Sequence, residues 1–166
     1  KKAYLSNEIK GEEQKLIGIS QFIMGVKSTI DKIAPTESRV LISGPSGTGK
    51  KFIAKLIHNS SKRKNGPIVY ANTKRILSHD IEKELFGHEN EEGIITKIGL
   101  IEQAHNGTFY IDEITNLSND LQSRFVKLLT EKSFLRVNGK STIEVNTRLI
   151  SGTSKSVVEE IKLKKF

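Results

Sequence analysis

Cysteine and tryptophan are absent from this chain of 166 residues, and only three prolines occur in it. The absence of cysteine excludes disulfide bonds and thiolate metal sites. The four histidines are not spaced as a metal-binding cluster, so we expect them to be structural or exposed. No apolar run is long enough to cross a bilayer, and no secretory signal is present. The sequence therefore predicts a cytoplasmic protein with no membrane partner.

Acidic residues are in the minority, since 27 Lys and Arg against 19 Asp and Glu give a net charge of +8. Excess positive charge fits a partner that carries phosphate groups, either nucleic acid or a nucleotide. It also fits a solvated, lysine-rich surface, which is the commoner cause. Charge thus leaves the partner open, while the length is enough for one domain with a substantial core.

A glycine-rich segment, residues 44–50, has the spacing Gly-x-x-x-x-Gly-Lys. It follows the apolar run 40–42 and precedes the helix-like stretch 52–57. In this order, strand, loop and helix favour a loop that cradles phosphates with its backbone N–H groups and its lysine. A simple glycine-rich turn before a helix is the alternative. The residues expected to bind a nucleotide are Gly44, Pro45, Ser46, Gly47, Thr48, Gly49, Lys50 and Lys51.

An apolar strand at 108–111 ends in Asp112 and Glu113, which supply the acidic chemistry that such a loop needs. Lys51 stands where the motif usually has Ser or Thr, and a protonated lysine cannot bind a metal ion. Magnesium must therefore depend on acids elsewhere, which argues against a simple kinase or small GTPase. Asp112 is expected to hold Mg²⁺ through water, and Glu113 to polarise a water for attack on the γ-phosphate. An exposed acid pair that ends a strand is the alternative.

Apolar periodicity predicts strands that alternate with helices, which is typical of an α/β fold with a parallel sheet flanked by helices. Residues 1–16 are expected to form a polar linker, and 17–166 the domain. Residues 87–99 show no clear period and are expected to form a loop. Helices are expected at 19–33, 50–60, 80–86, 100–104 and 119–131; sheet strands at 39–43, 68–71, 108–111 and 148–151; and hairpin strands at 134–137 and 141–145.

Several segments together carry a family resemblance: 40–50, 84–89, 106–114, 120–122 and 134–137. Through them the chain from about Ile17 onward resembles the AAA+ domain of bacterial enhancer-binding proteins, the sigma-54-dependent transcription activators. The resemblance implies a P-loop AAA+ ATPase that binds ATP or ADP with Mg²⁺ and assembles into a ring with copies of itself. In that family the position of Lys51 is usually Glu, so its lack of a hydroxyl is not unusual there.

The resemblance also gives roles to residues outside the two motifs. Asn72 matches an asparagine that acts as a switch on the catalytic glutamate, although a polar residue here could equally cap a turn. Arg136 matches an arginine near the subunit interface, with an exposed hairpin arginine as the alternative. Ser154 stands where the family has a sensor asparagine.

Two departures from the family concern the partner loop and the end of the chain. The family's sigma-factor loop motif is replaced by a shorter, acidic segment, 89–98. In it Ile94 and Ile95 are expected to pack against a neighbouring helix, with a small apolar contact for a partner as the alternative. The family's arginine fingers, last core strand and helical lid follow the position of Phe166. We therefore expect them to be missing here, and this chain alone to be a weak ATPase.

The replaced loop and segment 34–39 resemble the NtrX branch of two-component response regulators. The branch implies a receiver domain that answers to a sensor histidine kinase, a helix-turn-helix domain that binds DNA, and RNA polymerase with its sigma factor as a partner. A nucleotide-dependent oligomerisation module, with little hydrolysis and no sigma-54 remodelling, is the rival interpretation. The missing loop favours the rival, whereas Glu113 favours hydrolysis. A different P-loop ATPase, such as a helicase loader, is a third interpretation against which segment 84–89 argues.

Overall fold

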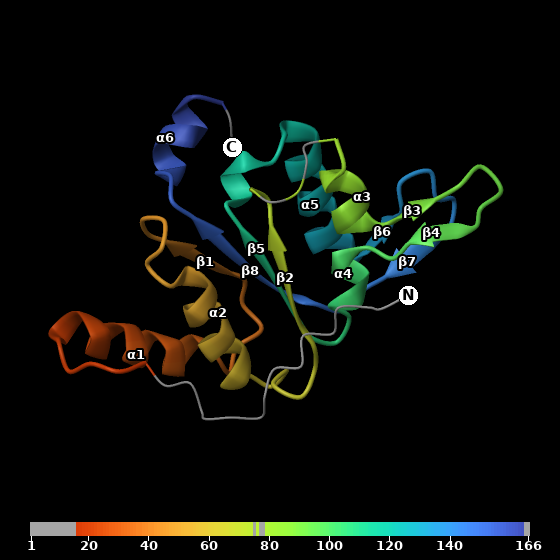
Figure 1. Cartoon of the computed structure of the whole chain (residues 1–166). Helices are drawn as coiled ribbons and strands as arrows, with labels where there is room; N and C mark the ends of the chain where they lie inside the picture. Colours follow the sequence, from red (N-terminus) through yellow and green to blue (C-terminus); the bar gives the residue numbers. More distant parts are fainter. Residues whose placement is uncertain (1–15, 75, 77–78, 165–166) are drawn as a thin grey trace.

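A four-stranded parallel sheet forms the centre of the molecule (Figure 1). The computed structural model describes residues 16–74, 76 and 79–164, so nearly all of the predicted linker lies outside the described residues. The strands, in spatial order, are β1 (Val40–Ser43), β8 (Arg148–Thr153), β5 (Thr108–Asp112) and β2 (Ile68–Asn72). All three pairings are parallel, so the carboxyl ends of the strands meet at one edge of the sheet.

Helices cover both faces of this sheet and bury a separate apolar cluster on each (Figure 1). One face carries α1 (Gln21–Ile33) and α2 (Lys50–Asn59). The other carries α3 (Ile81–Phe86), α4 (Leu100–Gln103) and α5 (Asn119–Glu131). The short helix η1 (Ile114–Asn116) follows β5, and α6 (Val157–Lys162) follows β8.

Strand β5 is almost continuously apolar because helices cover it on both faces of the sheet. Phe109 and Ile111 pack into the cluster beneath α3, α4 and α5, whereas Tyr110 packs into the cluster beneath α1 and α2. A strand between two layers of helices must be apolar on both sides. The predicted α/β class, with a parallel sheet flanked by helices, is confirmed.

The predicted loop at 87–99 is wrong, because this segment forms an antiparallel hairpin of β3 (His88–Glu89) and β4 (Ile95–Lys97). Its turn is closed by Asn90, whose Oδ1 accepts from the backbone N–H of Glu92 and of Ile94. Strands this short are too brief to show an alternating pattern in sequence.

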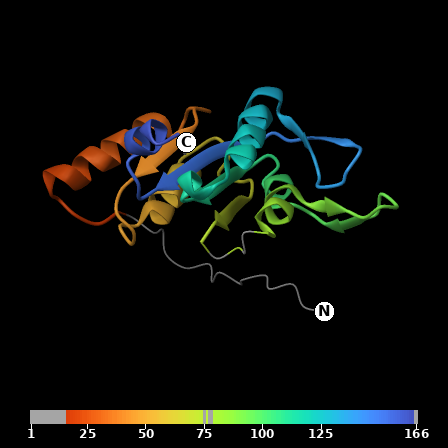
Figure 2. The same ribbon diagram turned by 90° about the horizontal axis from the view of Figure 1, so that it is seen from above.

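A second hairpin, β6 (Ser133–Leu135) and β7 (Thr142–Glu144), was expected and lies beside the first. A β-bridge between His88 and Val137 joins the two, and we call residues 87–99 and 133–144 together the hairpin arm. The arm extends away from the helices, as Figures 1 and 2 both show.

The packing expected for the isoleucines of the first hairpin is also wrong. Ile94 and Ile95 are 57% and 49% exposed. The cause lies in the hairpin, which carries them outward with the arm instead of folding them back as a loop against a helix (Figure 2).

Candidate functional site

The glycine loop joins β1 to α2 at the carboxyl edge of the sheet. Gly47 and Gly49 have φ angles of 83° and 86°, in the left-handed region that a glycine enters without steric cost. The N–H of Gly44 donates to the carbonyl of Thr153 at 3.1 Å, which fixes the start of the loop to β8. The loop therefore has the backbone conformation that its spacing predicts, at the first turn of a helix, where N–H groups are unpaired.

The two lysines that end the motif take different directions. The Lys50 side chain is only 7% exposed, and its Nζ donates to the carbonyls of Gly44 at 2.9 Å and Pro45 at 3.1 Å. The ammonium of Lys51 instead lies 4.1 Å from the centre of the Tyr70 ring. Lys50 is thus directed into its own loop, while the Lys51 ammonium makes a cation–π contact outside it.

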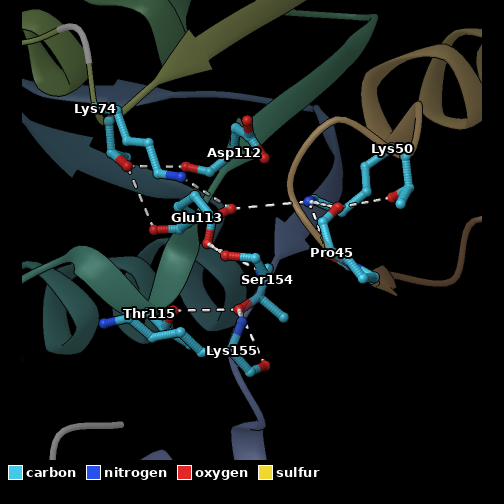
Figure 3. A network of polar contacts seen from close by, with 12 residues as sticks. Pro45, Lys50, Lys74, Asp112, Glu113, Thr115, Ser154 and Lys155 are labelled. Atoms are coloured by element: carbon cyan, nitrogen blue, oxygen red, sulfur yellow. Dashed lines mark hydrogen bonds and ion pairs between the residues drawn. The ribbon is translucent and has the colours of Figure 1, made fainter.

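Glu113 is the most enclosed acid of this edge, with a residue exposure of 1% and a left-handed φ of 54°. Its Oε2 accepts from the N–H and from the hydroxyl of Ser154, both at 2.9 Å. Its Oε1 lies 3.8 Å from Lys50 Nζ and 3.6 Å from Lys74 Nζ (Figure 3). A non-glycine residue held in this conformation by such a network points to a functional constraint.

The surroundings of Glu113 keep its carboxyl group ionised. Burial by itself raises the pKa of a carboxyl group. The two hydrogen bonds from Ser154 and the charges of Lys74 and Lys50 act in the opposite direction, and together they hold the pKa of Glu113 below its ordinary value. At neutral pH the group is therefore a carboxylate, which can accept a hydrogen bond from water.

Asp112 precedes Glu113 at the end of β5 and remains partly exposed. Its Oδ1 accepts from the Tyr110 hydroxyl at 3.1 Å. Burial, followed by the charge of Asp112, raises the pKa of Tyr110, so the phenol stays a donor. The close approach depends on Gly152, where an added Cβ would lie 2.4 Å from the Tyr110 hydroxyl oxygen and 2.9 Å from Asp112 Oδ1.

The acids of this edge fit magnesium only together with a phosphate ligand. Within the part of the chain that the structure describes, no group of three or more His, Asp or Glu could hold a metal ion. Mg²⁺ commonly binds through one or two carboxylates together with water and substrate phosphates. Asp112, beside the glycine loop, supplies one such carboxylate.

Residues 72–74 connect the end of β2 to the same edge. Asn72 pairs with Asp112 in the sheet register, and its Oδ1 accepts from the N–H of Lys74 at 3.0 Å. The Thr73 hydroxyl donates to the Asp112 carbonyl at 3.0 Å. The side chain of Asn72 therefore closes a turn, as its alternative interpretation expects, and its role as a switch stays a prediction.

The structure brings Lys50, Asn72, Asp112 and Glu113 to one edge, but it places Arg136 elsewhere. Arg136 lies in the hairpin arm and is 9% exposed, so the alternative of an exposed hairpin arginine is wrong. The buried charge of Arg136 is paired, because its guanidinium donates to Glu89 at 2.8 Å and to Glu102 at 2.7 and 3.1 Å.

Two contributors to the site had no assigned role in the sequence. Ser154 was visible only as a substitution for a sensor asparagine, and the structure shows it holding Glu113. Lys74 belongs to no motif, so only the fold reveals its proximity to Glu113. Of the histidines, His58 is buried and its Nδ1 lies 2.8 Å from Thr108 Oγ1, in agreement with a structural role.

A parallel α/β sheet with a glycine loop, its lysine and an acid pair at the carboxyl edge defines a P-loop nucleoside-triphosphatase fold. Residues 16–166 match the model of the Sigma-54 interaction domain family, and the chain belongs to this family. The family resemblance read from the motifs is thereby confirmed. No helix among the described residues has the length and apolar character of a membrane span.

The chain is also similar in sequence and structure to regulators of the NtrX type. The chain is 39% identical over 151 residues to the nitrogen assimilation regulatory protein NtrX of Azorhizobium caulinodans, covering 91% of this chain and 33% of that protein. The crystal structure of Brucella abortus NtrX in complex with ATP superposes with a TM-score of 0.86 at 37% identity, covering 92% of this chain and 33% of that one. The complex of the same protein with ADP gives 0.85 at 36% identity, with the same coverage. The chain thus spans about a third of the length of these relatives.

Proposed function

We propose that this domain binds ATP and ADP at the glycine loop and hydrolyses ATP with Glu113 as the water-activating group. The proposal rests on one observation: Lys50, Asp112 and Glu113 lie close together beside the glycine loop. The complexes of Brucella NtrX with ATP and with ADP support a nucleotide as the ligand.

Each residue has a distinct part in the proposed reaction. The N–H groups of residues 44–50 bind phosphate oxygens, and Lys50 exchanges its carbonyl partners for the β- and γ-phosphates. Asp112 holds Mg²⁺ through water, and this ion neutralises phosphate charge when bound. Glu113 accepts a hydrogen bond from the attacking water, and Ser154 orients its carboxylate. For the whole protein we propose a two-component regulator that assembles into a ring, with DNA, a histidine kinase and RNA polymerase as partners.

Calorimetry with ADP tests the binding part of the proposal. Lys50→Ala should weaken binding about 10- to 100-fold, because a charge-assisted hydrogen bond contributes about 1.5–3 kcal/mol. Lys127→Ala on α5 is the matched control, since Lys127 is exposed and pairs only with Glu131 among the ion pairs found in the described residues. Equal affinity of wild type and Lys50→Ala contradicts the assignment.

One observation favours the second candidate, a nucleotide-dependent assembly module that hydrolyses little. Oε2 of Glu113 accepts two hydrogen bonds from Ser154, and Oε1 has two lysine ammonium groups nearby, so in this state the carboxylate is held by the protein rather than presented to water. Because this chain alone is expected to be a weak ATPase, Glu113→Gln distinguishes the two functions when turnover is measured in the full-length protein. Loss of ATP turnover with ADP binding retained supports hydrolysis, whereas turnover at the wild-type rate supports the assembly module.

A further inference from the structure

Lys74 and Lys50 approach the Glu113 carboxylate from opposite sides, and the glycine loop lies on the Lys50 side (Figure 3). Ser154 occupies Oε2 of the Glu113 carboxylate, while Lys50 and Lys74 both approach the other oxygen, Oε1 (Figure 3). The distances to Oε1, 3.8 Å and 3.6 Å, are nearly equal. Two lysines therefore share one anionic oxygen, and one of them is the lysine of the phosphate loop.

The backbone at Lys74 is held in place, although its side chain is half exposed. Asn72 accepts from the Lys74 N–H, and Thr73 binds the carbonyl of Asp112. These contacts fix the end of β2 to the end of β5. Its aliphatic stem can still turn, so the ammonium can leave Oε1 while it stays at this edge.

The terminal phosphate of ATP brings negative charge close to Glu113, and ADP has no phosphate at this position. A γ-phosphate that Glu113 serves must lie close to that carboxylate, and two anions repel each other at short range. Lys50 offsets part of this repulsion, but it also serves the β-phosphate. In ADP the chain of phosphates ends before this position, so no second cation is needed there.

Resting on the proposed function, we propose that Lys74 is a second phosphate-binding residue, which contacts the terminal phosphate of a nucleoside triphosphate and favours triphosphate over diphosphate. In the structure, Oε1 of Glu113 lies between the ammonium groups of Lys50 and Lys74. In the proposed complex, an oxygen of the terminal phosphate takes this position between the two lysines. Transfer of both lysines to the phosphate frees Oε1 for water. The same exchange thus binds the triphosphate and releases the carboxylate.

The test compares nucleotide affinities of Lys74→Met, Lys74→Arg and wild type. The ligands are ADP and an ATP analogue with an imido bridge between the β- and γ-phosphates, each with Mg²⁺, titrated by calorimetry. Lys74→Met should weaken binding of the analogue about fivefold or more, and that of ADP less than about twofold. Lys74→Arg should stay within about twofold of wild type for both, because arginine keeps the charge and the donors.

Lys127→Met serves as the control for loss of one positive charge on α5, which packs on the other face of the sheet from α2. An equal loss of affinity for both ligands in Lys74→Met, or a loss for neither, overturns the proposal for Lys74. Binding of ADP that depends on Lys50 leaves the proposed function standing in either case. Failure of wild type to bind any nucleotide overturns the proposed function, and with it this inference.

Discussion

The carboxyl edge of the sheet and the hairpin arm both enclose ionised side chains, but their contacts differ in tightness. In the arm, Arg136 makes three hydrogen bonds of 2.7 to 3.1 Å to Glu89 and Glu102. At the edge, Lys50 and Lys74 stand 3.8 Å and 3.6 Å from Glu113, beyond direct hydrogen-bond length.

The difference separates a structural ion pair from one that can exchange partners. Arg136 is bound to acids from β3 and from α4, so it joins the arm to the helical layer. The lysines at the edge approach Glu113 without closing on it, and Lys50 also has two carbonyl partners. A ligand with phosphate groups can replace the lysine–Glu113 contacts at the edge at small cost. It cannot replace the direct hydrogen bonds of Arg136 in the arm. Stability should therefore depend on the arm's ions and activity on those of the edge.

The largest expected loss of stability comes from Arg136→Met. Removal of one partner of a buried ion pair leaves Glu89 buried without its cation, which typically costs about 3–5 kcal/mol. The melting temperature should fall by about 10 °C, measured by differential scanning calorimetry. Lys127→Met, which breaks an exposed pair on α5, should change stability by no more than about 0.5 kcal/mol. A loss below about 1 kcal/mol for Arg136→Met removes the contrast between the two regions.

A smaller loss is expected from Gly152→Ala in β8. The new Cβ would lie 2.4 Å from the Tyr110 hydroxyl oxygen, and overpacking of this kind costs about 1–3 kcal/mol. The side chains of Tyr110 and Asp112 must shift to make room, so the change also tests how rigid the edge is. Chemical denaturation measures the loss of unfolding free energy.

Tyr110→Phe supplies the control for Gly152→Ala, because it removes the hydroxyl that the new methyl group meets. In a double-mutant cycle the two changes together should cost less than the sum of their separate effects. Strict additivity contradicts the steric account.

The parts of the molecule that sequence could predict are those encoded by neighbouring residues. The glycine loop at 44–50 depends on a local backbone conformation, and Asp112 and Glu113 follow directly from an apolar strand. Lys74 and Ser154 could not be assigned in this way, because Ser154 meets Glu113 across 41 residues of sequence. Their contributions arise only where β2, β5 and β8 end together.

The first hairpin of the hairpin arm and the burial of Arg136 were harder to predict for the same reason. Arg136 is buried by Glu102 and Glu89, which lie 34 and 47 residues away in the sequence. Strand β3 has two residues and β4 three, too few for a recognisable period. The pairing of His88 with Val137 adds a contact between distant segments. The first hairpin therefore left no local pattern in the sequence, whereas the second, β6–β7, was expected.

Among the changes within the two regions, the smallest expected loss of stability comes from Ser154→Ala, which also separates stability from activity most sharply. The change removes the hydroxyl bond to Glu113 Oε2 but keeps the backbone N–H bond, so it should cost about 1 kcal/mol. Affinity for ADP should stay within about twofold of wild type, because Ser154 contacts the carboxylate and not the glycine loop. ATP turnover of the full-length protein should fall about tenfold as the carboxylate loses its orientation. Thermal denaturation, calorimetry with ADP and a phosphate-release assay measure the three quantities. A stability loss as large as that of Arg136→Met, with unchanged turnover, assigns Ser154 to the structure and makes the edge no different from the arm.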